Sequence, residues 1–312
     1  LGATKIKSQS EIITSNNMSL NGFEFNNLVN NSGILTIDNA EVYATTNSGI
    51  SSSLITNDST FEKIDNEGTI VANNLNVTGN SKENKGLINE GTLTITKGTV
   101  EYLYDENGII QINDGTFNVI KTNNYSSSTD ESIKPTEYSN YLNIEKGKFG
   151  SISSTNKIIN INNGKYSSIS SSGKYAILTI NNLELCGGLN NTDNSNVIIN
   201  DGTYNDIYNN ANAEINNGSI SQISNSSILN MSGGHIRDTA SNTGTFTMTG
   251  KSYSECEIQN EYVNVNSKIY RYGTFTMGIK DQNVVTNYPS IKGIVGGNMN
   301  FYDGNTLEEI GA

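Results

Sequence analysis

The chain has 312 residues and a net charge of −12, with a sequence pI near 4.6. This acidic balance argues against binding to nucleic acid or anionic lipid, because both need a basic surface. The charged fraction is only 16% and there are just 2 prolines, which argues against intrinsic disorder. No run of about 18 apolar residues occurs, so we expect no segment that inserts into a membrane.

Short strands are expected from the N-terminal region onward. In the coils from Ile110 to Phe246, apolar residues recur with a spacing of two, which places them on one face of a strand. Turns of the form Asn-x-Gly end at Gly33, Gly68 and Gly91, and the last one is followed by the strand-like run Thr-Leu-Thr-Ile at 92–95. Since Asn and Gly tolerate positive φ, these triplets predict tight bends between strands.

A clear repeat occupies the middle of the chain. Its unit is Ile-Asn-x-Gly-x-aromatic, as in Ile112–Phe117, Ile161–Tyr166 and Ile199–Tyr204. Most steps between units are 16 to 19 residues long. The expected turn positions are Gly98, Gly115, Gly147, Gly164, Leu183, Gly202, Gly218, Gly234 and Lys251.

One such unit cannot bury its own apolar face, but a stack of them can bury a continuous core. The pattern therefore predicts an all-β, single-stranded parallel β-helix, or β-solenoid, with coils of roughly 16–19 residues. Asparagines at equivalent positions should stack as ladders. The residues expected to point inward two positions after each turn are Val100, Phe117, Phe149, Tyr166, Leu185, Tyr204, Ile220, Ile236 and Tyr253.

Regular coils are expected over residues 1–258. Segment 121–140 is rich in Ser, Asn and Thr, so we expect a protruding loop there, although the long step from Gly115 to Gly147 also has room for an extra coil. Residues 259–312 keep the composition but lose the spacing, which predicts irregular C-terminal coils. We expect the chain to be part of a longer protein.

The two cysteines, Cys186 and Cys256, are predicted to be free thiols. They lie about four coils apart, which at roughly 4.8 Å per strand is about 19 Å. A disulfide needs Cα atoms closer than about 7 Å. The expected inward position of Cys256, three residues after Tyr253, indicates a structural role for that thiol.

Two stretches resemble repeats of the pectate-lyase-like right-handed β-helix adhesins, which are surface proteins of low-GC Gram-positive bacteria. The first runs from Met231-Ser232-Gly233-Gly234-His235-Ile236 to Asn242, and the second from Gly273-Thr274-Phe275-Thr276-Met277-Gly278 to Asn300-Phe301-Tyr302-Asp303-Gly304. The resemblance implies a right-handed solenoid, an extracellular location on the bacterial cell surface, and a role in attachment or as a stalk.

No catalytic residue, metal site or cofactor is predicted. The sequence has only one His, and Gly234-His235-Ile236-Arg237-Asp238 puts its imidazole beside an Arg and an Asp. Ile236 should point inward, so His235 and Arg237 should project outward as part of an exposed ion pair rather than a catalytic group. Tyrosines are the weak candidates for a binding surface, because clustered exposed aromatics mark one; they are Tyr102, Tyr104, Tyr125, Tyr138 and Tyr208.

The leading hypothesis for function is a non-enzymatic adhesin or stalk segment that binds a glycan or matrix protein on a host or neighbouring cell. One alternative is a carbohydrate-active β-helix, such as a polysaccharide lyase or a phage-type depolymerase, since glycoside hydrolysis needs two suitably spaced carboxylates and outward Asp and Glu on adjacent coils can meet that spacing. The other is a purely structural spacer that binds nothing.

Overall fold

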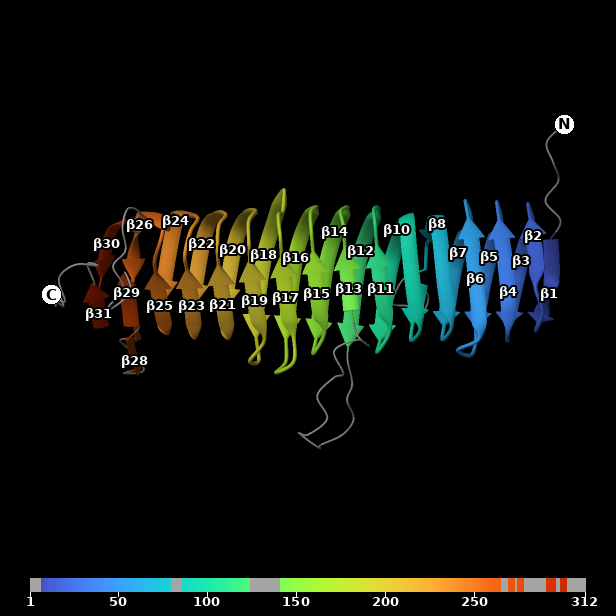
Figure 1. Cartoon of the computed structure of the whole chain (residues 1–312), viewed down its shortest axis with the longest axis horizontal. Coiled ribbons are helices and arrows are strands. Elements are labelled where there is room, and N and C mark those ends of the chain that lie inside the picture. The colour runs from blue at the N-terminus through green and yellow to red at the C-terminus, as the bar shows by residue number, and fades with distance from the viewer. Residues whose placement is uncertain are drawn as a thin grey trace. The chain divides into compact units, whose positions relative to one another are not determined.

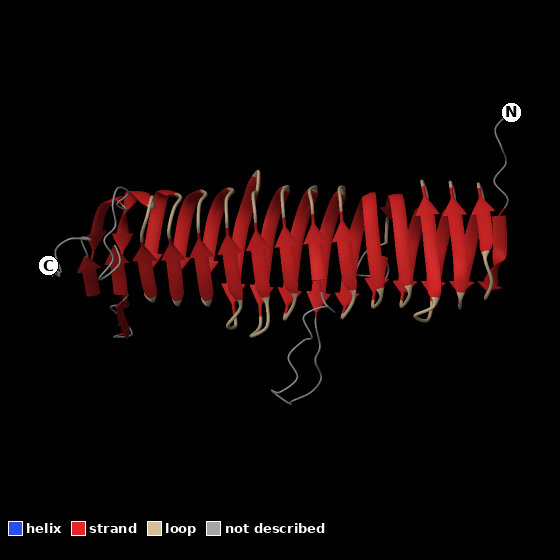
Figure 2. Cartoon of the chain, in the orientation of Figure 1, coloured by secondary structure: helices blue, strands red, loops and turns tan. Residues whose placement is uncertain are grey.

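The computed structural model shows an all-β, right-handed parallel β-solenoid of about 13 turns, with about 17 residues in each turn. It describes residues 7–79, 86–123, 141–264, 269–272, 274–277, 290–295 and 298–301. Within these ranges there is no helix, and therefore none long and apolar enough to cross a membrane. The predicted fold class is confirmed, and Figure 2 shows the described chain as strands joined by short loops.

The chain divides into two compact units, Leu1–Asn160 and Ile161–Ala312, which are described separately. In the first unit, one ladder of parallel strands contains β1 (Lys7–Thr14), β3 (Glu24–Asn30), β5 (Glu41–Asn47), β7 (Thr60–Asn66), β9 (Gly86–Asn89), β12 (Thr116–Asn123) and β14 (Lys148–Thr155). The other contains β2 (Met18–Asn21), β4 (Gly33–Asp38), β6 (Ser52–Asn57), β8 (Thr69–Val77), β11 (Ile109–Ile112) and β13 (Tyr141–Ile144). The long strand β10 (Thr92–Glu106) belongs to both ladders (Figure 1).

The second unit repeats this arrangement, and β15 (Ile158–Ile161) contains the boundary between the units. Its first ladder contains β16 (Lys165–Ser172), β18 (Leu185–Thr192), β20 (Thr203–Asn209), β22 (Ser219–Asn225), β24 (His235–Asn242), β26 (Tyr253–Gln259) and β30 (Ser290–Val295). Its second contains β17 (Ile177–Ile180), β19 (Asn196–Ile199), β21 (Asn212–Ile215), β23 (Ile228–Met231), β25 (Thr245–Met248), β29 (Thr274–Met277) and β31 (Asn298–Phe301). An antiparallel pair, β27 (Glu261–Asn264) and β28 (Ile269–Tyr272), interrupts the parallel order within 259–312.

Strand register stacks like residues above one another. Val197, Ala213, Leu229 and Phe246 are register partners in successive coils of the second unit, and all four are at most 5% exposed. The inward positions predicted two residues after each turn are buried in most coils, including those at Phe117, Tyr166, Tyr204 and Ile236. Removing this apolar surface from water is the main stabilising contribution of the stack.

The prediction was wrong for Leu185, Tyr253 and Cys256. Leu185 is 39% exposed and Tyr253 is 41% exposed, while the buried register positions beside them are held by Cys186 and Ser254. Both turns contain one residue more than the others: Cys186 follows Ile180 by six positions, whereas Tyr166 follows Ile161 by five. A one-residue shift exchanges the two faces of a strand.

The Cys256 side chain is only half-buried, and Ile258 holds the aliphatic column with Ala240 as its register partner. A second extra residue adds to the shift here, because Ile258 follows Ser254 by four positions, as Ala240 follows Ile236, whereas Ile223 follows Ile220 by three. The prediction that both cysteines are free thiols is confirmed, with Cys186 buried.

The direct pairings around segment 121–140 settle whether an extra coil lies there. Strand β11 pairs directly with β13, and β12 pairs directly with β14, so no coil fits between them. Residues 121–123 belong to β12, and 124–140 lie outside the described residues. The long step from Gly115 to Gly147 is therefore an insertion between two adjacent coils.

Glycines at the two turns of a coil serve different purposes. Gly115 and Gly202 have φ of 147° and 133°, a region that favours glycine, as the Asn-x-Gly pattern predicts. Gly91 is not in that region, so the positive φ expected at this other turn of the coil is wrong there, and Gly244 is likewise outside the region. A Cβ on Gly244 would lie 2.2 Å from the main-chain oxygen of Ser227, so that glycine is required by the close approach of the preceding coil.

Replacing Gly244 by alanine is therefore expected to lower the free energy of unfolding by about 1–3 kcal/mol, because backbone atoms must move apart to admit the methyl group. Gly188 provides the control, since a Cβ there meets nothing within 4 Å and no left-handed φ is required. Urea unfolding of the two alanine variants checks this, and equal effects would contradict the steric explanation.

An inner asparagine ladder runs through each unit. In the second unit the amide nitrogen of each Asn donates to the amide oxygen of the next, at 2.6–2.7 Å, and the ladder comprises Asn191, Asn209, Asn225, Asn242 and Asn260. In the first unit the equivalent ladder comprises Asn30, Asn47, Asn66 and Asn89, with distances of 2.7–2.9 Å. These side chains are at most 2% exposed, and the donating nitrogens also donate to main-chain carbonyls. The predicted stacking of asparagines is confirmed.

A second, outer ladder runs along the turns of the second unit with the opposite polarity. The amide nitrogens of Asn181, Asn200 and Asn216 each donate to the asparagine of the preceding coil, at 2.5–2.9 Å. The inner ladder donates toward the following coil instead. Asn181 is exposed, so this outer ladder competes with water and contributes less than the inner one.

Candidate functional site

The structure describes three of the five tyrosines predicted as binding candidates. Tyr102 and Tyr104 are half-buried neighbours on β10 of the first unit, and Tyr208 is 46% exposed on β20 of the second. Burial, followed by the nearby Tyr104, raises the pKa of Tyr102. Tyr125 and Tyr138 lie outside the described residues.

The His235 constellation is an arrangement of outward-facing side chains. Ile236 is buried, so His235 and Arg237 point outward as predicted. The His235 ring stacks on Tyr253, with centroids 4.9 Å apart, and its Nε2 lies 3.2 Å from Oε1 of Glu255. Arg237 donates to the Oγ of Ser221 at 2.6 Å. His235 thus lies beside a carboxylate of the next coil, although its Nε2 makes no hydrogen bond.

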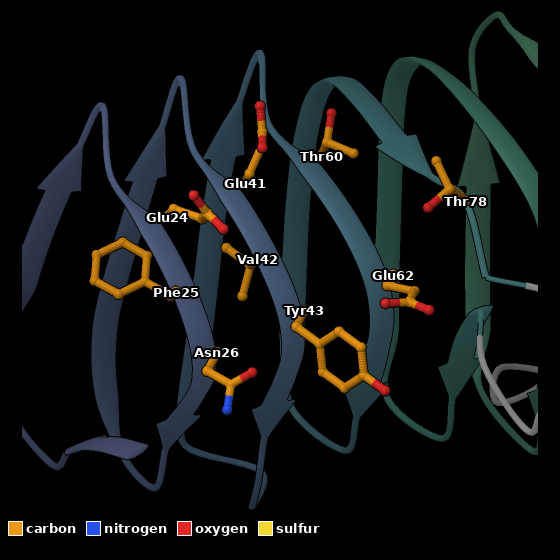
Figure 3. Close-up of a pocket in the computed structure, with 9 residues that line it drawn as sticks. All are labelled: Glu24, Phe25, Asn26, Glu41, Val42, Tyr43, Thr60, Glu62 and Thr78. Atoms are coloured by element: carbon orange, nitrogen blue, oxygen red, sulfur yellow. The ribbon is translucent and has the colours of Figure 1, made fainter. Parts of the chain in front are cut away.

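A hollow of about 260 Å³ lies on the outer face of the first unit, over β3, β5 and β7 (Figure 3). Buried Phe25 and Val42 form its floor, and Tyr43, which is 50% exposed, stands in its wall. The residues that line it are Glu24, Phe25, Asn26, Glu41, Val42, Tyr43, Thr60, Glu62 and Thr78.

Strand register explains why acidic side chains gather in this hollow. Glu24 pairs with Glu41 in the next coil, and Glu41 pairs with Thr60 in the one after. Neighbouring strands are about 4.8 Å apart, so the two carboxylates belong to one short column. Figure 3 shows Tyr43 and Glu62 on the same face as this column. The hollow therefore combines an aromatic ring with carboxylate, amide and hydroxyl groups.

These residues were not among those predicted from the sequence. The signal that could have found them is the alternation within Glu24-Phe25-Asn26 and Glu41-Val42-Tyr43, where the central residue faces the core. The flanking residues then face outward at the same height in adjacent coils. That inference needs the register of the first coils, where the repeat is weakest.

A second hollow, of about 430 Å³, lies over the short strands β17, β19, β21 and β23 of the second unit. Ile177 and Ile228 are 38% and 47% exposed at its two sides. Between them the register positions are held by Asn196 and Asn212, which are joined by a 3.2 Å hydrogen bond. The hollow is open, and the only titratable group in its lining is Glu214.

One ion pair is completely buried in the first unit. Lys157 donates to Oδ2 of Asp105, and both side chains are 0% exposed. Asn89, the last member of the inner ladder, donates to Oδ1 of Asp105 at 2.7 Å. Lys157 also donates to the main-chain oxygen of Gly108 at 2.6 Å. Burial raises the pKa of Asp105 and lowers that of Lys157, although attraction between the two groups opposes both shifts.

A buried column of titratable groups occupies the second unit. Cys186 pairs in register with Tyr166 and Tyr204. Burial raises the pKa of Cys186 from 9.0 to about 12, against a weaker opposing effect of its hydrogen bond to Gly188. Burial, followed by the nearby Cys186, also raises the pKa of both tyrosines.

Stability is expected to fall as the pH rises above about 9. The unfolded chain then releases the Cys186 proton, which the folded chain holds up to about pH 12, so folding is disfavoured by up to about 1.4 kcal/mol per pH unit. Urea unfolding at pH 8, 9 and 10 should show a steeper loss for the wild type than for Cys186→Val. Equal slopes would contradict this assignment.

Among the described residues, no group of three or more His, Cys, Asp or Glu side chains is arranged to hold a metal ion. No protein-family model matches the chain, and neither a curated protein nor a solved structure matches it. The parallel solenoid thus rests on the structure itself, and the resemblance to β-helix adhesins rests on the two sequence stretches that carry it.

Proposed function

We propose that the chain is a non-enzymatic segment of a bacterial cell-surface protein that mediates attachment, and that its first unit binds a glycan in the hollow over β3, β5 and β7. The observation that carries this proposal is the exposed ring of Tyr43 above an apolar floor, flanked by hydrogen-bonding groups. Aromatic rings beside a few polar groups are typical of small-ligand sites. The extracellular location is supported by the adhesin-like stretches 231–242 and 273–304.

The acidic lining narrows the class of ligand. Three carboxylates, those of Glu24, Glu41 and Glu62, line the hollow, and the chain as a whole carries a net charge of −12. Like charges repel, so an anionic polysaccharide is disfavoured. Neutral or amine-bearing sugars fit better, because their hydroxyl and ammonium groups donate hydrogen bonds to carboxylates.

A glycan array probed with the folded chain tests the proposal. Binding of a neutral or amine-bearing sugar by the wild type, reduced roughly tenfold or more in Tyr43→Ala, is the expected result. Tyr253→Ala is the matched control, since Tyr253 is 41% exposed but lies in the second unit. Failure of the wild type to bind any glycan in the array, or any matrix protein in a host-matrix binding assay, would favour the structural spacer.

The carbohydrate-active alternative is favoured by one observation, the register pairing of Glu24 with Glu41. Two carboxylates on adjacent strands are about as far apart as the pair in a retaining glycosidase. Incubation of the wild type with the sugars it binds distinguishes the two functions. An attachment protein leaves them intact, whereas turnover that is lost in Glu41→Gln would establish an enzyme.

A further inference from the structure

We propose that Lys157 and Asp105 become joined by an intramolecular amide bond between the lysine Nζ and the aspartate Cγ. The proposal starts from contact: the amine lies directly against Oδ2 of the carboxyl group, and both side chains are fully buried. Among the described residues, this is the only ion pair in which both partners are 0% exposed. The bond would tie together residues 52 positions apart in the sequence.

The position of each residue in the coils shows that the contact is built into the fold. Asp105 occupies the position after the last asparagine of the inner ladder. In the next two coils the same register position is held by Thr122 and then by Ser154, whose side chains are smaller than asparagine. Lys157 follows Ser154 by three residues, as Gly108 follows Asp105. The lysine side chain therefore reaches back along the solenoid axis, over about two coils, to the end of the ladder.

The surroundings hold the two reacting groups in place. Lys157 Nζ donates to Gly108 O at 2.6 Å, which fixes the amine beside the carboxyl. Asn89 donates to Oδ1 of Asp105 at 2.7 Å, and the main-chain N–H of Gly108 also donates to this carboxyl group. The Asn89 donor at Oδ1 polarises the C=O bond and stabilises the negative charge that develops on this oxygen when a nucleophile adds. Because the fold already holds the two groups together, their reaction avoids the loss of translational and rotational entropy that a bimolecular reaction requires.

Burial also supplies the protonation states that amide formation needs. An ammonium group is not a nucleophile, and a carboxylate resists attack. Burial disfavours both charges: it lowers the pKa of Lys157 and raises that of Asp105. Transfer of one proton from Nζ to Oδ2 within the contact converts the ion pair to a neutral amine and a neutral carboxylic acid, without exchange with solvent.

The reaction then balances with no other reagent. The Nζ lone pair forms a bond to Cγ, and Oδ1 carries the charge of the tetrahedral intermediate while Asn89 donates to it. The bond from Cγ to Oδ2 breaks, and Oδ2 leaves as water with its own proton and one more from Nζ. The products are one amide and one water molecule, with no oxidant, reductant or metal.

Intact-mass spectrometry of the purified wild-type chain tests the proposal directly. The expected mass is that of the sequence minus one water molecule, and trypsin should no longer cleave after Lys157. Tandem spectra should show a branched peptide that joins the segments around 105 and 157. A folded wild-type chain with the full sequence mass would overturn the proposal and leave a buried ion pair.

Lys157→Arg is the matched control, because the guanidinium keeps a positive charge but forms no such amide. This variant should show its full sequence mass and migrate more slowly than the wild type on a denaturing gel, since the closed loop is absent. A water loss that persists in Lys157→Arg would also overturn the proposal, since it would arise elsewhere, for example at the Asp-Gly turns Asp114-Gly115 and Asp201-Gly202.

Discussion

Replacing Asn209 by aspartate is expected to lower the free energy of unfolding by about 4 kcal/mol or more, although the two side chains have nearly the same shape. The Asn209 amide nitrogen donates to Asn225 Oδ1 at 2.7 Å and to Ile228 O at 2.8 Å, and the side chain is 0% exposed. A carboxylate would face two acceptors at these places and would carry a buried charge with no cation beside it. Urea unfolding followed by circular dichroism measures the loss.

Asn181→Asp is the control for this prediction. Asn181 belongs to the outer ladder of the same unit and donates to Asn162 at 2.5 Å, but it is exposed. Water replaces the lost donor and solvates the new charge, so the expected effect is within about 1 kcal/mol. Similar losses of unfolding free energy in Asn209→Asp and Asn181→Asp would contradict the explanation that burial makes the inner ladder the more stabilising of the two.

Lys157→Met is expected to lower the free energy of unfolding by about 3–5 kcal/mol, because it leaves Asp105 buried without its partner. Loss of the amide bond would add to this effect, since a covalent closure also restricts the unfolded chain. Thermal and urea unfolding of the chain, followed by circular dichroism, should show the loss.

The double variant Lys157→Met, Asp105→Asn shows how much of the stability lost in Lys157→Met comes from the unpaired carboxyl group of Asp105. Asp105 occupies the register position that follows Asn89, so an asparagine there extends the inner ladder by one member. The added Asp105→Asn change is expected to raise the free energy of unfolding by at least about 1 kcal/mol relative to Lys157→Met alone. It adds one buried hydrogen bond and removes a buried acid. A double variant less stable than the single one would show that the carboxyl group is stabilising even without the lysine.

Local patterns predicted most of the core. The spacing of two around Ile161 and the turn at Gly164 suffice to place Tyr166 inside, because alternation along a strand is a property of a few consecutive residues. The same rule failed at Leu185, where the turn holds one residue more than usual. Turn length is not visible in an alternation pattern, so an unrecognised insertion shifts every later side chain of that strand.

The sequence patterns could not predict contacts between residues that are far apart in the chain. Lys157 and Asp105 are 52 residues apart and fall outside the repeat unit. Two features of the sequence point to this contact: Asp105 stands in a column of asparagines, and Lys157 occupies the position in its coil that Gly108 occupies in an earlier one. Both features can be recognised only after the strand register is known. The hollow at Tyr43 was missed for the same reason, since Glu24 and Glu41 become neighbours only when the coils stack.

The single direction of the inner ladder has an electrostatic consequence for Asp105. Asn30, Asn47 and Asn66 all donate toward the following coil, so their amide dipoles add instead of cancelling. The oxygen end of this row is Asn30, whose Oδ1 accepts no hydrogen bond. Its N–H end meets Asp105 through Asn89. The ladder thus acts on this carboxyl group as the N-terminus of a helix acts on an anion: through Asn89 it opposes, without outweighing, the increase in the pKa of Asp105 that burial causes, and it stabilises the negative charge that develops on Oδ1 when the lysine adds.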